Sequence, residues 1–421
     1  MDRDFPAFVK LGDGLNITGI SLYGGRRSLS TRRQYPLVYL GGDGSADHRK
    51  SQCLEGALKP DDVAGKIVLC DEGFVPREKK GYVVKQAGAL GMILANALGE
   101  ELTADSHLLP AVNVGAAEGK AIKEYVKGSP RPTATLAFAG TRLGLRPSPV
   151  VAKFSSRGPN ILTSEILKPD VVGPGVNILA AWSGAASPSA MPEDHRRFRF
   201  NIISGTSMSC PHVAALLRAR HPNWKPAAIR SALMTTAYVH DNTLQPLKDA
   251  ATGAASTHYA HGAGHINPSK ALDPGLVYDL GRQDYINFLC TLKLTPYQLK
   301  IFTRSSNESC RHALASPGDL NYPAISASLP ASSQLTVHRT VTNIAAPVST
   351  YHVSISPFKG AAVEVEPSTL RFTRKKQKLQ YSVTFIAKSP QQTSPEFGAL
   401  IWTDRTHMVR SPVVITYPAT V

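Results

Sequence analysis

The sequence has no long run of apolar residues. Among its 421 residues no stretch of about 18 consecutive apolar side chains occurs, and a membrane-spanning helix needs about that many. We therefore expect no such helix. The first residues, MDRDFPAFVKLGDGLNITG, also lack the apolar core of a signal peptide. Taken literally, the chain has no route into the secretory pathway, although glycosylation sequons begin at Asn16 and Asn307.

Acidic residues are scarce in this chain. It has 31 Asp and Glu against 47 Lys and Arg, which gives a formal net charge of +16. Such a charge permits attraction to nucleic acid or to anionic surfaces. The basic residues are scattered, however, and the densest runs, at 195–200 and 371–378, carry no nucleic-acid-binding motif. We predict neither a nucleic-acid partner nor a membrane partner.

Cysteine is scarce as well, with five residues in the chain. Cys53 and Cys70 bracket one short segment, Cys290 and Cys310 bracket another, and Cys210 stands apart. Two local disulfides and one buried thiol would fit an oxidising compartment, whereas five free thiols would fit the cytosol. Spacing alone leaves both open. No metal motif of recognisable spacing is present, so we expect no metal and no cofactor.

Periodicity and turn residues divide the chain into three regions. Strands and helices alternate between about residues 35 and 140, which predicts a small α/β domain. Short strands, Gly/Pro-rich loops and two helices follow up to about residue 285. From about residue 318 short alternating runs predict an antiparallel β-sandwich. The predicted segments of the first two regions are strands at 65–73, 92–97 and 133–140, and helices at 78–91 (ending at Gly91), 116–128, 207–222 and 225–237.

The run SGTSMSCPHV, residues 204–213, places a serine at the start of a predicted helix. Ser207 follows Gly205, which allows close backbone approach. Free backbone N–H groups and the positive end of the helix dipole could there stabilise an oxyanion. The pattern suits a nucleophilic serine, with Pro211 tolerated in the first turn. Geometry alone also allows the simpler interpretation that Ser207 only caps the helix.

Several long motifs resemble those of plant subtilases, a family of subtilisin-like serine proteases. The run GTSMSCPHV, with HPNWKPAAIRSALMTTA after it, is similar to the serine segment of that family. FSSRGPN, LKPDVVGPGVNILAAW and GAGHINPSKALDPGLVYDL resemble stretches that flank its active site. Residues 35–140 resemble the inserted protease-associated (PA) domain, and the last hundred residues, from LNYPAI, resemble the fibronectin III-like domain. The resemblance covers essentially the whole chain.

This resemblance implies an α/β fold class. It consists of an incomplete subtilisin-like parallel sheet with helices, a small α/β PA insert and a C-terminal antiparallel β-sandwich. We expect the few remaining strands of the sheet, near Val150 and at 171–180, to expose an edge. The implied domains are 1–34, a remnant of the catalytic domain; 35–141, the PA domain; 142–317, the C-terminal half of the catalytic domain with Ser207; and 318–421, the fibronectin III-like β-sandwich.

The resemblance assigns Ser207 as the nucleophile of a serine endopeptidase. The aspartate, histidine and oxyanion-hole asparagine of the family precede the PA insert, and residues 1–34 contain no histidine. His212 and Asp170 match structural positions. A serine without its base is a weak nucleophile, so we expect an N-terminally truncated chain that is inactive alone, and a fragment of a longer protease would explain it. The alternative is a non-catalytic homologue that binds proteins or peptides through its PA and fibronectin III-like domains.

Other expectations also follow from the resemblance. It implies the disulfides Cys53–Cys70 and Cys290–Cys310, a small buried Cys210, and an extracellular, apoplastic location. The partner is a protein or peptide substrate, and a homodimer through the PA domain is an implied possibility. After PHV the chain passes directly to AALL, where the family has three more residues. Three residues amount to about 300° of helix rotation, so we expect this helix to repack or to be strained.

Overall fold

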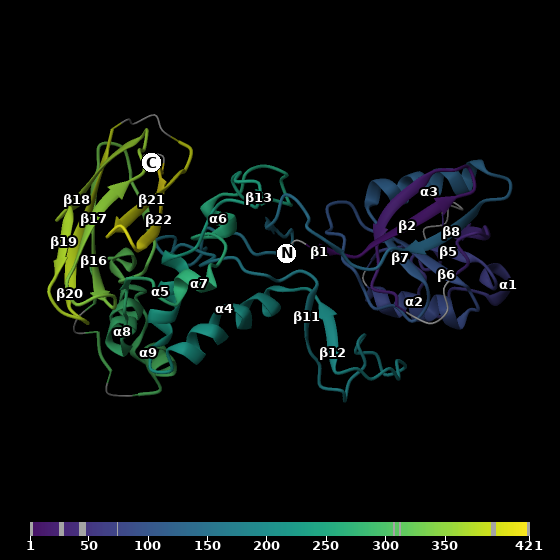
Figure 1. Cartoon of the computed structure of the whole chain (residues 1–421), viewed down its shortest axis with the longest axis horizontal. Coiled ribbons are helices and arrows are strands. Elements are labelled where there is room, and N and C mark those ends of the chain that lie inside the picture. Colours follow the sequence, from purple (N-terminus) through teal and green to yellow (C-terminus); the bar gives the residue numbers. More distant parts are fainter. Residues whose placement is uncertain are drawn as a thin grey trace. The chain divides into compact units, whose positions relative to one another are not determined.

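The computed structural model describes residues 3–24, 29–41, 48–73, 75–305, 308–310, 313–388 and 393–418, without the side chains of 212–214 and 216. They form two compact units (Figure 1). The first unit contains residues 1–148, 152–154 and 175–208, and the second contains 149–151, 155–174 and 209–421.

A closed barrel forms the centre of the first unit (Figure 1, purple and blue). Its neighbouring strands pair in the order β2-β3-β7-β6-β5-β4-β8. The pairs β4–β5, β5–β6 and β6–β7 are parallel, and the other pairs are antiparallel. The strands are β2 Pro6–Leu11, β3 Asn16–Ile20, β4 Tyr35–Tyr39, β5 Ile67–Asp71, β6 Gly91–Ala95, β7 Ala111–Val114 and β8 Thr133–Phe138.

Three helices accompany the barrel in the described chain: α1 Pro60–Val63, α2 Arg77–Gln86 and α3 Ala116–Gly128. The strands predicted at 65–73, 92–97 and 133–140, and the helix predicted at 116–128, are confirmed. The end expected for α2 at Gly91 is wrong. The helix stops at Gln86, because Gly88 takes a left-handed φ of 83° and Gly91 already begins β6.

The barrel extends outside the range 35–141 that the sequence predicted for this domain. Strands β2 and β3 lie before residue 35, yet β2 pairs with β8 and β3 pairs with β7. The physical reason is burial, because Ala7, Val9 and Leu11 alternate on one face of β2 and are almost fully buried in the barrel core. The other predicted boundaries stay predictions.

A β-hairpin leads to the serine segment in the first unit. Strand β11, Ile178–Ala181, pairs antiparallel with β12, Phe200–Ile203, and residues 182–199 connect the two strands. We expected β11 in a parallel sheet, and that expectation is wrong, because the next segment of chain folds back as its partner. Leu179 and Phe200 are 55% and 61% exposed on this hairpin. Nearby, β1 Arg3–Asp4 pairs with β9 Arg142–Leu143.

The second unit contains most of the helices and a short parallel pair. Strand β10, Val150–Val151, runs parallel to β13, Lys248–Asp249. Helix α5 starts with Pro226 in its first turn, as predicted, and is buried almost all round. The described helices are α4 Thr206–Arg220, which begins in the first unit, α5 Pro226–Thr235, α6 His258–His261, α7 Pro268–Ala271, α8 Arg282–Thr291, α9 Pro296–Thr303 and the 3₁₀ helix η1 Pro317–Asp319.

The predicted C-terminal β-sandwich is confirmed in the second unit. Its core contains the fully buried Trp402, which meets Tyr381 edge-to-face at 5.1 Å between ring centroids. The pair β15–β22 is parallel, and the other pairs are antiparallel. One sheet has the order β14 Leu276–Val277, β16 Gln334–Asn343, β20 Lys378–Ala387, β18 Ala361–Glu366, and the other β15 Ile325–Ser328, β22 Met408–Thr416, β21 Glu396–Thr403, β17 Ser349–Ile355, β19 Thr369–Phe372.

The cysteines form two disulfides and leave one thiol. Cys53 is bonded to Cys70, and Cys290 to Cys310, as the resemblance implied. Cys210 is free and exposed, so the expectation that it is buried is wrong. It lies in the first half of α4, where no described side chain is buried; of the described side chains of this helix, Leu217 is the buried one.

Candidate functional site

Ser207 lies in the first turn of α4, directly after strand β12. The helix begins at Thr206, and the Ser207 side chain is exposed. Two hydrogen bonds hold the chain that enters the helix: Gly205 N donates to the Gly175 carbonyl at 2.7 Å, and Asn177 N donates to the side-chain Oγ of Ser204 at 2.8 Å. All of these residues belong to the first unit. The serine is therefore presented to solvent from an anchored turn.

The helix start gives Ser207 a favourable electrostatic setting. The first N–H groups of a helix have no partner within it, and they carry the positive end of the dipole. Pro211 lies inside the helix rather than in its first turn, which corrects our expectation. Proline has no N–H to donate to the carbonyl four residues earlier, which here is the carbonyl of Ser207. The serine thus lies at the positive end of the α4 dipole.

No hydrogen bond among the described side chains joins the Ser207 hydroxyl to a histidine or a carboxylate. Asp170 instead accepts hydrogen bonds from Lys168 Nζ at 2.5 Å and from the Tyr322 hydroxyl. The side chain of His212 lies outside the described residues. Within the part of the chain that the structure describes, Ser207 therefore has no base bonded to it.

Of four other histidines, His107, His258 and His261 are buried and His265 is half-buried, and each has a hydrogen-bond partner other than Ser207. Burial lowers the pKa of His107, His258 and His265 to about 4, and that of His261 to about 3. Each of them is therefore neutral at pH 7. The ring of His258 lies between the carbonyls of Gly262 and Gly398, at 2.7 and 3.0 Å. Contacts of this kind are typical of structural residues in a core and not of a catalytic base.

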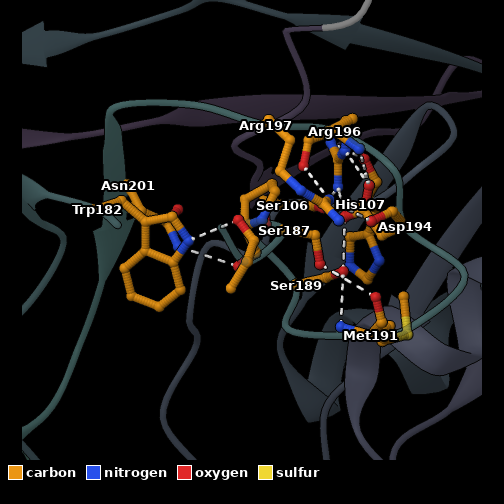
Figure 2. Close-up of polar contacts among 12 residues, drawn as sticks. Ser106, His107, Trp182, Ser187, Ser189, Met191, Asp194, Arg196, Arg197 and Asn201 are labelled. Carbon is orange, nitrogen blue, oxygen red and sulfur yellow. Dashed lines mark hydrogen bonds and ion pairs between the residues drawn. The ribbon is translucent and has the colours of Figure 1, made fainter. Parts of the chain in front are cut away.

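A polar cluster that the sequence analysis missed lies in the loop between β11 and β12. Its centre is a pair between Asp194, which is 1% exposed, and Arg196 (Figure 2). Arg196 Nε and Nη2 donate to the two carboxylate oxygens of Asp194 at 2.9 and 2.8 Å. Ser189 Oγ donates to the same carboxylate at 2.6 Å. Burial alone would raise the pKa of Asp194, but these hydrogen bonds lower it to about 2.

Arg196 also fastens the loop to the barrel domain. Its Nη2 donates to the carbonyl of Ser106 at 2.6 Å and its Nη1 to the carbonyl of His107 at 3.2 Å (Figure 2). A second contact joins the loop to α2, where Lys79 Nζ lies 2.8 Å from Glu193 Oε1. We call the set Asp194, Arg196, Ser106 and His107 the arginine clamp.

Two titratable groups with shifted pKa values, Asp105 and His107, lie in the segment whose carbonyls accept hydrogen bonds from Arg196. His107 Nε2 lies 3.3 Å from Asn113 Oδ1, whereas its buried Nδ1 has no partner. Nε2 therefore carries the proton of a neutral ring, and a second proton on Nδ1 would have no acceptor. Asn113 Nδ2 donates to Asp105 Oδ2 at 2.7 Å. Burial, followed by the charge of Glu78, raises the pKa of Asp105 to about 7.

Comparison with known proteins decides the family. Residues 78–264 match the family model described as "Subtilase family", residues 33–122 match "PA domain", and residues 319–415 match "Fibronectin type-III domain". Subtilisin-like protease SBT1.3 of Arabidopsis thaliana is 59% identical over 99% of this chain and 54% of its own length. SBT1.5 and SBT1.7 of the same plant are 50% and 49% identical over 99% of this chain and 56% of their own lengths.

The chain belongs to the subtilase family. It spans about half the length of the curated relatives it matches. Members of this family are serine proteases and thus hydrolases. The chain also matches a PA domain and a fibronectin III-like domain. The PA match starts at residue 33 and leaves out β2 and β3, which the structure pairs with the rest of the barrel.

The sequence predicted Ser207 as the nucleophile, which stays a prediction, but it did not predict the arginine clamp. The run at 195–200 showed only that it carries no nucleic-acid-binding motif, and the signal that could have singled out Arg196 was the acidic Asp194 two residues earlier. The sequon at Asn16 lies at the exposed start of β3, and Asn307 lies outside the described residues. In the described part of the chain no helix combines the length and the apolar character needed to cross a membrane. No group of three or more His, Cys, Asp or Glu among those residues is arranged to hold a metal ion.

Proposed function

We propose that Ser207 is the nucleophile of a subtilisin-like serine endopeptidase. The observation that carries this is the position of Ser207, exposed in the first turn of α4 within the run GTSMSCPHV. In this role its hydroxyl oxygen attacks the carbonyl carbon of a peptide bond, a base takes the hydroxyl proton, and an acyl-enzyme forms as the amine leaves. The positive end of the α4 dipole supports the negative charge on the carbonyl oxygen.

We also propose that these 421 residues do not hydrolyse peptides by themselves. The support is that no described histidine or carboxylate is hydrogen-bonded to Ser207. Loss of triad members costs about 10⁴- to 10⁶-fold in kcat for serine proteases of this mechanism. The residual rate depends on the oxyanion hole, for which this chain offers no asparagine at a position that matches the family.

A chimera tests both statements. The part of Arabidopsis SBT1.3 that precedes the segment aligned with this chain is joined to residues 1–421, and cleavage of a fluorogenic peptide is compared with that by residues 1–421 alone. We expect cleavage by the chimera, none by its Ser207→Ala variant and none by the chain alone. Cleavage by the chain alone would refute the second statement, and an active Ser207→Ala chimera would refute the first.

The partner of this proposed activity is a protein or peptide, which the subtilase and PA matches support. We propose an extracellular, apoplastic location, supported by the two disulfides, because disulfides persist in oxidising compartments. A homodimer through the PA domain is part of the proposal, and light scattering of the purified chain measures it.

The alternative function is a non-catalytic one, in which the chain binds proteins or peptides through its PA and fibronectin III-like domains. The observation that favours it is that the barrel and the sandwich each have a closed core of their own. An inactive chimera together with specific peptide binding by the chain would favour this alternative.

A further inference from the structure

A pocket lies between the end of α2 and the loop between β11 and β12 that carries Asp194 and Arg196. Its volume is about 710 Å³. Every residue that lines it belongs to the first unit. One wall comes from helix α2, the other from the loop, and Leu108 of the barrel domain adds to the lining. We call it the α2 pocket; it is lined by Tyr82, Lys85, Gln86, Leu108 and residues 192–196.

The acidic groups of the α2 pocket are already neutralised. Glu193 is paired with Lys79 at 2.8 Å, and the pKa of its carboxyl is lowered by that hydrogen bond. Asp194 is fully buried under Arg196 (Figure 2). Neither carboxylate is left to receive a cation from solvent. The pocket therefore presents little free negative charge despite its two acidic residues.

The cationic group of Lys85, in contrast, remains available to a ligand. Lys85 and His195 are exposed, and no ion pair of Lys85 occurs among the described residues. Arg196 keeps 31% of its side chain exposed although it holds Asp194. A net charge of +16 on the whole chain adds a long-range attraction for acidic partners. The charge of the pocket thus favours a carboxylate.

Apolar surface lies beside these charges and gives the pocket its second recognition element. Lys79 Nζ lies over the ring of Tyr82, 5.0 Å from its centroid, in a cation–π contact. Tyr82, Leu108 and Pro192 form the apolar part of the lining. The arginine clamp fixes the loop wall on the carbonyls of Ser106 and His107. A pocket that combines an apolar lining with the exposed Lys85 suits a carboxylate that has an apolar side chain next to it.

We propose that the α2 pocket binds an acidic segment of a protein or peptide chain, with a carboxylate at Lys85 and an adjacent apolar side chain on Tyr82 and Leu108. This inference goes beyond the proposed function, since it assigns a binding site that does not include Ser207. Binding requires no catalysis, so the site can be tested in a chain that cleaves nothing.

The test uses the whole 421-residue chain with Ser207→Ala, which removes cleavage as a complication. The probe is a fluorescein-labelled eight-residue peptide of alternating Glu and Leu, and its partner has Gln at every Glu. Fluorescence anisotropy measures both affinities. We expect the Gln peptide to bind at least about tenfold more weakly, a difference of about 1.4 kcal/mol. Equal binding of the two peptides would overturn the proposal.

Matched charge reversals locate the binding. Lys85→Glu changes the pocket, whereas Lys127→Glu makes the same change at the end of α3; both lysines are exposed and lie in the last turn of their helices. We expect Lys85→Glu to weaken binding of the Glu peptide about tenfold and Lys127→Glu to change it less than about twofold. Equal losses would show attraction by net charge alone and would contradict a specific pocket.

A third variant guards against misfolding of Lys85→Glu. Gln86 is exposed on the same wall, and Gln86→Glu adds a negative charge without removing a cation. This substitution should also weaken binding of the Glu peptide while leaving the affinity for the Gln peptide unchanged. Unaltered binding of the Glu peptide by both pocket variants would overturn the proposal, whatever the chimera shows for Ser207.

Discussion

At the scale of single residues, Arg196 combines more interactions than any motif suggested. One guanidinium neutralises the buried Asp194 and holds two backbone carbonyls of the barrel domain. Hydrogen bonds to charged groups contribute more than neutral ones, and a buried carboxylate that loses its partner is costly. Arg196 therefore attaches the loop that precedes strand β12 and Ser207 to the barrel domain.

Replacement of Arg196 should release this loop. In Arg196→Ala the Asp194 carboxylate stays buried without its cation, and we expect the free energy of local opening to fall by about 2–3 kcal/mol. Amide hydrogen exchange of residues 183–199 measures it. Arg199→Ala serves as the control, because Arg199 is exposed and in no ion pair among the described residues. Exchange that accelerates equally in both variants would contradict the clamp.

Asp105 predicts a pH dependence of barrel stability. Its pKa is about 7 in the folded chain because of burial, against about 3.9 in an unfolded chain. Between about pH 4 and pH 7 the folded chain keeps a proton that the unfolded chain has lost, so this group lowers stability as pH rises, by at most about 1.4 kcal/mol per pH unit. Asp105→Asn cannot ionise, and its amide oxygen can still accept from Asn113.

Hydrogen exchange of the β7 amides in Asp105→Asn and in the unaltered chain tests this dependence. The advantage of the variant should grow as pH rises from 4 to 7. The comparison cancels the opposite contribution of His107, whose folded pKa of about 4 lies below its usual value, so that its contribution to stability is lost as pH falls from about 6.5 to 4. An advantage that does not vary with pH would show that Asp105 is not protonated in the fold.

The sequence predicted a role for Ser207, which stays a prediction, but it did not predict the contacts of Arg196, and the reason is physical. The motif around Ser207 is local, so that Gly205 and the helix start are visible in the run itself. The clamp joins residues about 90 positions apart, and nothing in a basic run reveals which arginine meets two distant carbonyls.

At the scale of elements, β2 shows why the barrel is larger than predicted. Ala7, Val9 and Leu11 face the core and Lys10 faces solvent, so the strand satisfies the alternation of a barrel wall. The predictions that held, such as the strand at 65–73 and the helix at 116–128, depend on periodicity within one segment. The pairing of β11 with β12 depends on which partner strand is near, and periodicity carries no such information.

A pair of substitutions in β2 tests its place in the barrel. Val9→Asp buries an unpaired carboxylate and should destabilise the barrel by more than about 3 kcal/mol. Lys10→Asp introduces the same group on the exposed face and should change stability by less than about 0.5 kcal/mol. Hydrogen exchange of β8, the neighbour of β2, measures both. Similar effects of the two substitutions would place β2 outside the barrel.

At the scale of the whole molecule, the two disulfides predict how many cysteines react with a thiol reagent. Iodoacetamide added to the native, unreduced chain should modify one thiol, Cys210, because it is the free and exposed cysteine. After unfolding and reduction all five should react. Mass spectrometry counts the adducts. Three or more adducts on the native chain would mean that a disulfide is absent, and the support for an extracellular location would weaken accordingly.

The main proposal for the whole molecule is that Ser207 acts as a nucleophile and that residues 1–421 alone do not hydrolyse peptides. Labelling by a fluorophosphonate, with the modified residue mapped by mass spectrometry, tests it most directly. We predict labelling at Ser207 in the chimera with SBT1.3, its loss in the Ser207→Ala chimera, and no labelling of residues 1–421 alone. Stoichiometric labelling of the chain alone, or labelling of another residue in the chimera, would contradict the claim.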